Sequence, residues 1–161
     1  MTLQNMPKLK IRLQEESEGL RKYIVCLGPK QLGMVRCSYP NPYESYIFRN
    51  GSYVEARNTE NIVSGIEWVI KTGLGIREAK PTREATFSRL HNLLQNNNHV
   101  LYDKRGHRGL RKAIRNKLGY ASSVEVLDEP TCYVVIAIID DELYALRTPD
   151  KYSHKPRWIR Y

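Results

Sequence analysis

The longest apolar run in the sequence, Tyr133–Ile139, constrains the fold more than any other feature. Such a run is typical of a central strand that is covered on both faces. It is far too short for a membrane-spanning helix, which needs roughly 18 apolar residues. Turn-forming residues stand on both sides of it, at Asp128-Glu129-Pro130 and at Asp140-Asp141. We therefore predict three consecutive strands, with Val124–Leu127 before this run and Glu142–Arg147 after it.

The first third of the chain also has the patterns of strands. Residues Leu9–Gln14 alternate between apolar and polar side chains, and Lys22–Leu27 is rich in β-forming residues. The clearest local prediction is a hairpin at Asn50-Gly51, because a type I′ turn needs two residues that tolerate a positive φ. This hairpin would pair Tyr46–Arg49 with Ser52–Glu55.

The middle of the chain has apolar residues at helical spacing. A first helix is predicted to begin at a cap on Asn58 or Thr59 and to end at Gly73. A second helix follows an N-cap at Thr82 and ends in the polar run Asn96–Asn98. The apolar stripes that these two helices would bury are Ile62, Val63, Ile66, Val69 and Ile70, and then Phe87, Leu90, Leu93 and Leu94.

Strands, then three helices, then strands predict an α+β fold, with the helices packed on one face of a mostly antiparallel sheet. The length of 161 residues favours a single compact domain over 1–161. We expect a flexible N-terminus over about residues 1–7 and a basic, aromatic tail over about residues 150–161. A split into two small domains between Gly73 and Lys80 stays open, although each half would have a marginal core.

The positive charge of the chain is concentrated in two short segments. The formal net charge is +9, from 26 basic and 17 acidic residues. Eleven of the basic residues lie in Lys104–Lys117 and Lys151–Tyr161, and neither segment contains an acidic residue. The rest of the chain, with 15 bases against all 17 acids, is slightly acidic. Localised positive charge of this kind is expected of a protein with a polyanionic partner.

The first basic segment is predicted to form an amphipathic helix from about His107 to Leu118, with Gly119 as its stop. Its apolar stripe consists of Leu110, Ile114 and Leu118. A second face carries, at i, i+3, i+4 and i+7, the cations Arg108, Arg111, Lys112 and Arg115. Arginine can grip a phosphate through two parallel hydrogen bonds, which favours a binding role. A solvated outer face without a ligand explains the same pattern, so both interpretations stay open.

The C-terminal segment Lys151–Tyr161 interleaves cations with aromatic residues, a composition that combines phosphate neutralisation with base stacking. We interpret this tail as a second binding element that orders on its partner. The alternative is that Trp158 and Ile159 simply anchor the C-terminus to the domain.

No catalytic or metal-binding signature is present in the sequence. One class of metal-dependent nucleases needs an aspartate ahead of an acid-x-Lys triplet. That order is absent, because no aspartate precedes Glu78-Ala79-Lys80. His91, His99 and His107 recur at every eighth residue, which does not place them on one helix face. The acids of Asp140–Glu142 are explained by a turn, without a Mg²⁺ ion shared with an acid such as Glu125.

The cysteines and the N-terminus favour a cytoplasmic protein. Cys26, Cys37 and Cys132 are odd in number and show no CxxC spacing, so we expect reduced thiols. The N-terminal residues lack the pattern of a signal peptide, and no membrane association is expected.

We therefore expect a small, non-enzymatic protein that binds DNA or RNA through phosphates and needs no cofactor. Its predicted contacts are Lys104, Arg105, Arg108, Arg111, Lys112, Arg115, Lys117, Lys155, Arg157, Trp158 and Arg160. A second hypothesis is a protein-binding module or inhibitor whose basic face docks on an acidic protein surface. A metal-dependent nuclease is a third. The sequence predicts no oligomeric state.

Overall fold

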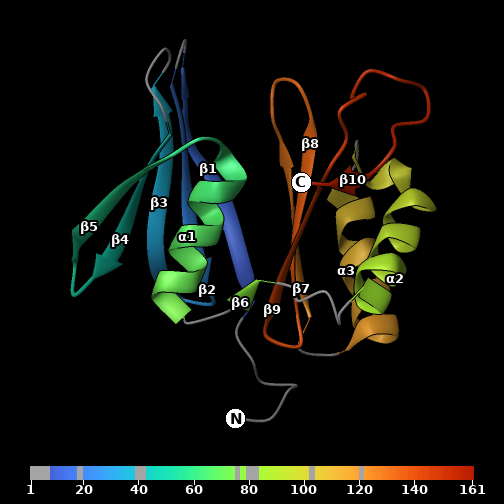
Figure 1. Cartoon of the computed structure of the whole chain (residues 1–161), viewed down its shortest axis with the longest axis horizontal. Coiled ribbons are helices and arrows are strands. Elements are labelled where there is room, and N and C mark those ends of the chain that lie inside the picture. The colour runs from blue at the N-terminus through green and yellow to red at the C-terminus, as the bar shows by residue number, and fades with distance from the viewer. Residues whose placement is uncertain are drawn as a thin grey trace. The chain divides into compact units, whose positions relative to one another are not determined.

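The computed structural model of the protein describes residues 8–17, 20–38, 43–74, 77–78, 84–101, 104–119 and 122–161 (Figure 1). Contacts among them separate into two compact units, an N-terminal unit within Pro7–Arg77 and a C-terminal unit within Glu78–Tyr161. The boundary falls in the segment where the sequence left a split open. The single domain stays a prediction, and the expected flexible N-terminus lies outside the described residues.

The fold is α+β, as predicted, with antiparallel strands toward both ends of the chain and the helices in its middle. The N-terminal unit is a five-stranded meander whose strands pair in chain order. These strands are β1 (Leu9–Ser17), β2 (Leu20–Leu27), β3 (Lys30–Ser38), β4 (Tyr43–Arg49) and β5 (Ser52–Thr59). The predicted type I′ turn between β4 and β5 is confirmed, because Asn50 and Gly51 have φ values of 52° and 83°.

Helix α1 (Ile62–Leu74) packs on one face of the meander and buries its predicted apolar stripe. It begins later than predicted, because β5 continues as far as Thr59. The N-cap is Asn61, whose Oδ1 accepts a hydrogen bond of 2.8 Å from the backbone N–H of Ser64. Gly73 lies inside the last turn of the helix and not after it.

Gly65 allows α1 to approach the meander closely. A Cβ atom at this position would lie 2.6 Å from Ser45 Oγ and 2.9 Å from Val35 Cγ1. Such distances are shorter than van der Waals contact, so a larger residue would push the helix away from the sheet.

The C-terminal unit is an antiparallel sheet with two helices on one face (Figure 1). Its strands, in spatial order, are β10 (Ile159–Arg160), β9 (Glu142–Arg147), β8 (Tyr133–Ile139) and β7 (Ser123–Asp128), and the short β6 (Arg77–Glu78) also pairs with β9. The helices α2 (Glu84–Gln95) and α3 (Lys104–Leu118) are separated by the 3-10 helix η3 (Asn98–Leu101).

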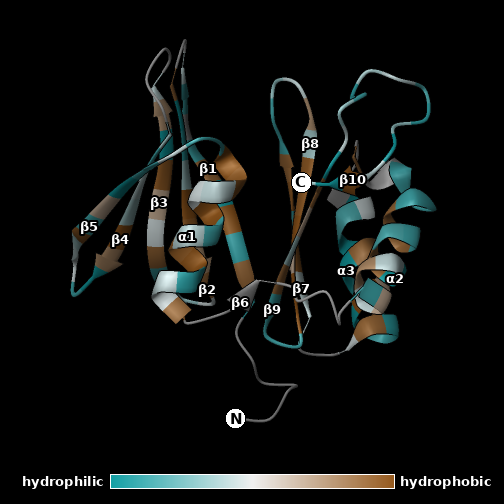
Figure 2. Cartoon of the chain, viewed as in Figure 1, coloured by the Kyte–Doolittle hydropathy of each residue, from teal (hydrophilic) through white to brown (hydrophobic). Residues whose placement is uncertain are grey.

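The three strands predicted around the apolar run are confirmed. Every residue of β8 is buried, and the turn that follows it has φ values of 52° at Asp140 and 61° at Asp141. In Figure 2, β8 is mostly brown, whereas α2 and α3 carry both teal and brown segments, as amphipathic helices do. None of the described helices is long and apolar enough to cross a membrane.

Candidate nucleic-acid interface

Helix α3 docks on the C-terminal unit through the predicted apolar stripe. Leu110, Ile114 and Leu118 are buried at 2%, 0% and 8% exposure, in the same cluster as alternate residues of β8. This packing stabilises the helix although two glycines in its first half lower its intrinsic propensity. Gly119, with a φ of 128°, ends the helix as predicted.

The helix begins three residues earlier than the sequence predicts, at Lys104. Arg105 therefore belongs to α3, one turn before Arg108. With 100° per residue, four cations share an arc of about 80° on the side away from the apolar stripe. We call these residues the cationic face of α3: Arg105, Arg108, Lys112 and Arg115.

The cationic face is accessible. Arg105, Arg108 and Lys112 are exposed, and Arg115 is half-buried. No acidic residue occurs anywhere on the helix. Within the described part of the chain, the side chains of Arg108 and Lys112 form no hydrogen bond or ion pair. Gly109, on the same side of the helix, has open space around it, so that a ligand can approach the helix backbone there.

Arg111, which the sequence places on the binding face, has a structural role. Its Nη2 pairs with Glu125 Oε1 at 3.2 Å, and its Nε donates to the carbonyl oxygen of Val124 at 3.4 Å. Glu125 has only 12% of its side chain exposed. The pair ties α3 to β7 and neutralises Arg111. The structure therefore replaces Arg111 with Arg105 in the row of accessible cations.

Trp158 does not provide the accessible stacking surface that the sequence suggested. It is 1% exposed and belongs to the core of the unit. Its indole Nε1 donates to Asn98 Oδ1 at 2.9 Å, and its backbone N–H donates to Gln95 Oε1 at 3.1 Å. Its carbonyl oxygen lies 2.7 Å from His91 Nε2. The alternative interpretation, in which this residue anchors the C-terminus, describes the structure.

The chain after Trp158 adds strand β10, in which Ile159 pairs with Arg147 of β9. Nη2 of Arg160 donates to both carboxylate oxygens of Glu84, at 2.8 and 2.7 Å, and the guanidinium lies 4.0 Å from the centre of the Phe87 ring. The C-terminal segment is thus packed on the unit and partly neutralised.

Acidic residues close to the tail neutralise other cations in it. The backbone N–H of Arg157 donates to Asp150 Oδ1 at 2.9 Å and holds the pKa of that carboxyl below its usual value. The Arg157 side chain lies 3.6 Å from the same carboxylate. Lys151 donates to Asp128 and to the carbonyl oxygen of Glu129. Burial alone would lower the pKa of Lys151, but the bond to Asp128 raises it overall.

Three predicted cations remain outside these groups. Lys155 and Lys117 are exposed, but Lys117 lies on the opposite flank of α3 from the cationic face. The backbone of Lys104 starts the helix, and its side chain is outside the described residues. The structure therefore gathers four of the eleven predicted residues into one surface.

Among the described residues, no group of three or more His, Cys, Asp or Glu side chains could hold a metal ion. His91 instead contacts the backbone of Trp158, and Glu125 pairs with Arg111. Cys26, Cys37 and Cys132 all belong to the described residues, and none of them forms a disulfide. Burial is the main cause that raises the pKa of the Cys132 thiol.

Sequence reasoning missed a second polar surface, which lies on the N-terminal unit. A pocket there is lined by Arg12, Leu13, Gln14, Ile24, Gln31 and Tyr53. The alternation in Leu9–Gln14 was a signal for it, because that pattern turns the polar residues of β1 to one face.

Neither the family models nor the curated proteins nor the solved structures with which the chain was compared include a match.

Proposed function

We propose that the protein binds nucleic acid through phosphates on the cationic face of α3. The observation that carries this proposal is the row of four cations on one rigid helix, with no acid on that helix and with Arg108 and Lys112 unpaired within the described residues. A solvated helix face usually gains stability from mixed charges at i, i+4 spacing, and here that gain is forgone.

The dimensions of the face suit a polyanion. Arg105 and Arg115 are ten residues apart, so the row is about 15 Å long at 1.5 Å per residue. A single strand of B-DNA carries one charge per roughly 3.4 Å of axis, so the row can follow several consecutive phosphates. Three of the four cations are arginines, which hold phosphate with two hydrogen bonds. Phosphate contacts position a protein on nucleic acid and carry no base specificity.

The test is a comparison of two double variants that remove the same charge. Arg108→Gln with Lys112→Gln removes two unpaired cations from the cationic face. Arg49→Gln with Arg57→Gln removes two exposed cations from β4 and β5 of the N-terminal unit. Binding of labelled duplex DNA, duplex RNA and single strands is measured by fluorescence anisotropy in 0.1 M salt.

The α3 variant is expected to weaken binding by about 60-fold. Each of the two lost phosphate contacts contributes close to 0.9 in log K per tenfold dilution of salt below about 1 M, so log K at 0.1 M falls by about 1.8. The control is expected to stay within about threefold of the parent, since its two arginines do not belong to the cationic face of α3. Equal losses in the two variants would mean that only net charge matters and would overturn the proposal. An absence of binding to every nucleic acid at low salt would do the same, and would favour the acidic protein partner.

A further inference from the structure

The meander of the N-terminal unit has one face covered by α1 and a second face that carries polar and aromatic side chains. We call the second one the outer face. The strand registers place Arg12, Ile24, Met34 and Tyr46 in one row across β1 to β4. A small apolar cluster of Ile24, Cys26 and Met34 lies at its centre, and Tyr46 packs against it.

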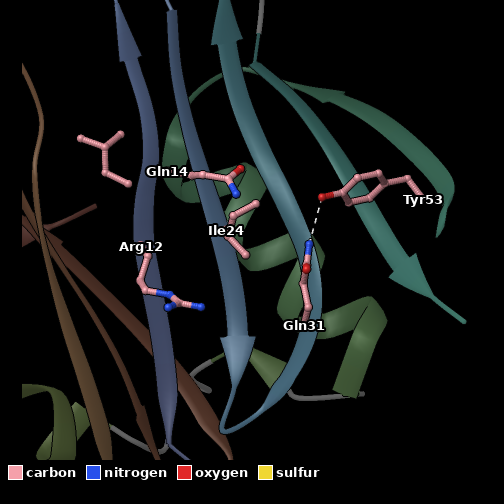
Figure 3. Close-up of a pocket in the computed structure, with 6 residues that line it drawn as sticks. Arg12, Gln14, Ile24, Gln31 and Tyr53 are labelled. Atoms are coloured by element: carbon pink, nitrogen blue, oxygen red, sulfur yellow. Dashed lines mark hydrogen bonds between the residues drawn. The ribbon is translucent and has the colours of Figure 1, made fainter. Parts of the chain in front are cut away.

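A pocket of about 340 Å³ opens on this face (Figure 3). Its volume falls in the range of sites that hold one small ligand or one part of a larger one. The lining combines two apolar residues, Leu13 and Ile24, with two amides, a guanidinium and a phenol ring. Figure 3 shows Arg12 and Gln14 extending from β1, and Tyr53 joined to Gln31 by a hydrogen bond.

Tyr53 supplies an aromatic surface that is both exposed and held in place. Tyr53 is 42% exposed and is one of the large hydrophobic residues that remain exposed. Its hydroxyl accepts a hydrogen bond of 2.9 Å from Gln31 Nε2. Its ring meets those of Tyr46 and Phe48 edge to face, at 5.8 and 5.2 Å between centroids. These contacts fix the orientation of the ring and leave part of it open for stacking.

The two amides give the pocket both donors and acceptors. The side-chain Nε2 of Gln31 donates to Tyr53, so the side-chain oxygen of the same amide can still accept a hydrogen bond from a ligand. Gln14 is exposed, and its side chain has no hydrogen bond within the described residues. Nucleobases present donors and acceptors side by side on one edge, and amide side chains match that pattern.

Three cations lie around the pocket, on β1 and β2. Arg12 Nη2 lies 4.0 Å from the thiol sulfur of Cys26, which is a weak contact. Lys10 and Lys22 flank Arg12 and Ile24 along β1 and β2. None of these three cations forms an ion pair with a described residue. Arg36, farther along the face, is already paired with Glu44 at 3.3 Å.

We infer that the outer face binds single-stranded nucleic acid, with one base in the pocket against Tyr53 and neighbouring phosphates on Arg12, Lys10 and Lys22. A base in a duplex is stacked and paired, so it cannot lie against a ring on a flat sheet. A single strand can turn its bases out. This inference rests on the proposed function only for the class of ligand, because its residues belong to the other unit.

The test uses Tyr53→Ala and Tyr53→Phe, with Tyr152→Ala as the matched control. Tyr152 is a tyrosine of the C-terminal unit that is 85% exposed. The probes are a labelled 12-nucleotide oligothymidine, the corresponding oligouridine and a blunt 12-base-pair duplex. Thermal unfolding of each variant shows whether the fold is retained.

Tyr53→Ala is expected to weaken single-strand binding roughly tenfold, the usual effect of losing one stacked base, and to leave duplex binding unchanged. Tyr53→Phe keeps the ring and is expected to stay within about threefold of the parent, as is the control. Arg12→Gln is expected to reduce the salt slope for single strands by about 0.7.

The inference fails if Tyr53→Ala and the control bind single strands equally well, or if the parent protein binds only duplexes. Neither result contradicts the proposed role of α3. Conversely, a loss of single-strand binding in Tyr53→Ala, with no effect of Arg108→Gln and Lys112→Gln on any probe, would overturn the proposed function and leave this inference standing.

Discussion

Replacing Asn98 with alanine tests whether the C-terminal segment is a structural part of the unit. Asn98 Oδ1 is the acceptor for the indole N–H of Trp158, at 2.9 Å. Asn98 Nδ2 also donates to the carbonyl oxygen of Pro156 at 3.1 Å, but that oxygen keeps a second donor, Gln95 Nε2, at 3.2 Å. The substitution therefore leaves mainly one group without a hydrogen-bond partner, the indole N–H of Trp158, a residue that is 1% exposed.

The expected cost follows from that single group. A buried donor left without a partner costs about 1–3 kcal/mol, so Asn98→Ala should lower the free energy of unfolding by that amount. In a Trp158→Phe background no indole N–H exists, and the same substitution should cost less than about 1 kcal/mol. The difference between the two backgrounds is the coupling energy of the pair.

Urea unfolding of the four proteins of this cycle, followed by far-UV circular dichroism, measures the coupling. Circular dichroism is preferred to fluorescence because Trp158→Phe removes one of the two tryptophans in the chain. If Asn98→Ala lowers the free energy of unfolding equally in both backgrounds, the indole N–H does not donate to Asn98. The segment would then be free to contact a ligand, as the sequence first suggested.

Three further substitutions and one chemical modification test the packing around the candidate sites. Arg111→Glu should destabilise the protein by about 1–3 kcal/mol in urea unfolding, because it places a second carboxylate beside the nearly buried Glu125; an unchanged stability would contradict the pairing. Two glycine-to-alanine changes on helices should change the stability of the protein in opposite directions. Gly109→Ala, with open space around it, should stabilise the protein by up to about 1 kcal/mol, and Gly65→Ala should destabilise it by about 1–3 kcal/mol; equal signs in thermal unfolding would refute the close approach of α1. Because burial raises the pKa of the Cys132 thiol, its modification by a maleimide at pH 8 should be slower in the folded than in the unfolded protein, and equal rates would contradict its burial.

Local sequence patterns predicted the secondary structure well where the local interaction is the decisive one. Asn50-Gly51 and Asp140-Asp141 adopt the positive φ values that their residue types favour. The apolar run of β8 is buried along its whole length. The start of α1 was misplaced, because Asn58 and Thr59 are good caps in isolation but are held in β5 by pairing with β4. The cap then falls to Asn61.

The composition of the candidate site was harder to predict, because ion pairs join residues that are distant in sequence. The basic segments contain no acids, so they looked unpaired. The fold brings Glu125 of β7 to Arg111 and Glu84 of α2 to Arg160. The amphipathic pattern predicted the helix and the side of it that is buried. Which cations on the opposite side stay free depended on tertiary contacts.

The tail shows the same limit for aromatic residues. A tryptophan among cations suits base stacking and core packing equally well, and only its neighbours decide between them. Here Gln95 and Asn98 at the end of α2 and in η3 bind the backbone and the indole of Trp158. The polar run after α2, which sequence reasoning treated as a helix stop, thereby also anchors the C-terminus.

The central claim, that α3 binds phosphates, is tested most directly by the salt dependence of duplex binding in single variants. The apparent association constant is measured between about 0.05 and 0.3 M salt for the parent, Arg108→Gln and the control Arg57→Gln. A lysine or arginine that contacts a phosphate adds close to 0.9 to the slope of log K against log salt. The slope should therefore become shallower by about 0.9 in Arg108→Gln and stay unchanged in Arg57→Gln. An unchanged slope in Arg108→Gln would show that the cationic face of α3 does not contact phosphate.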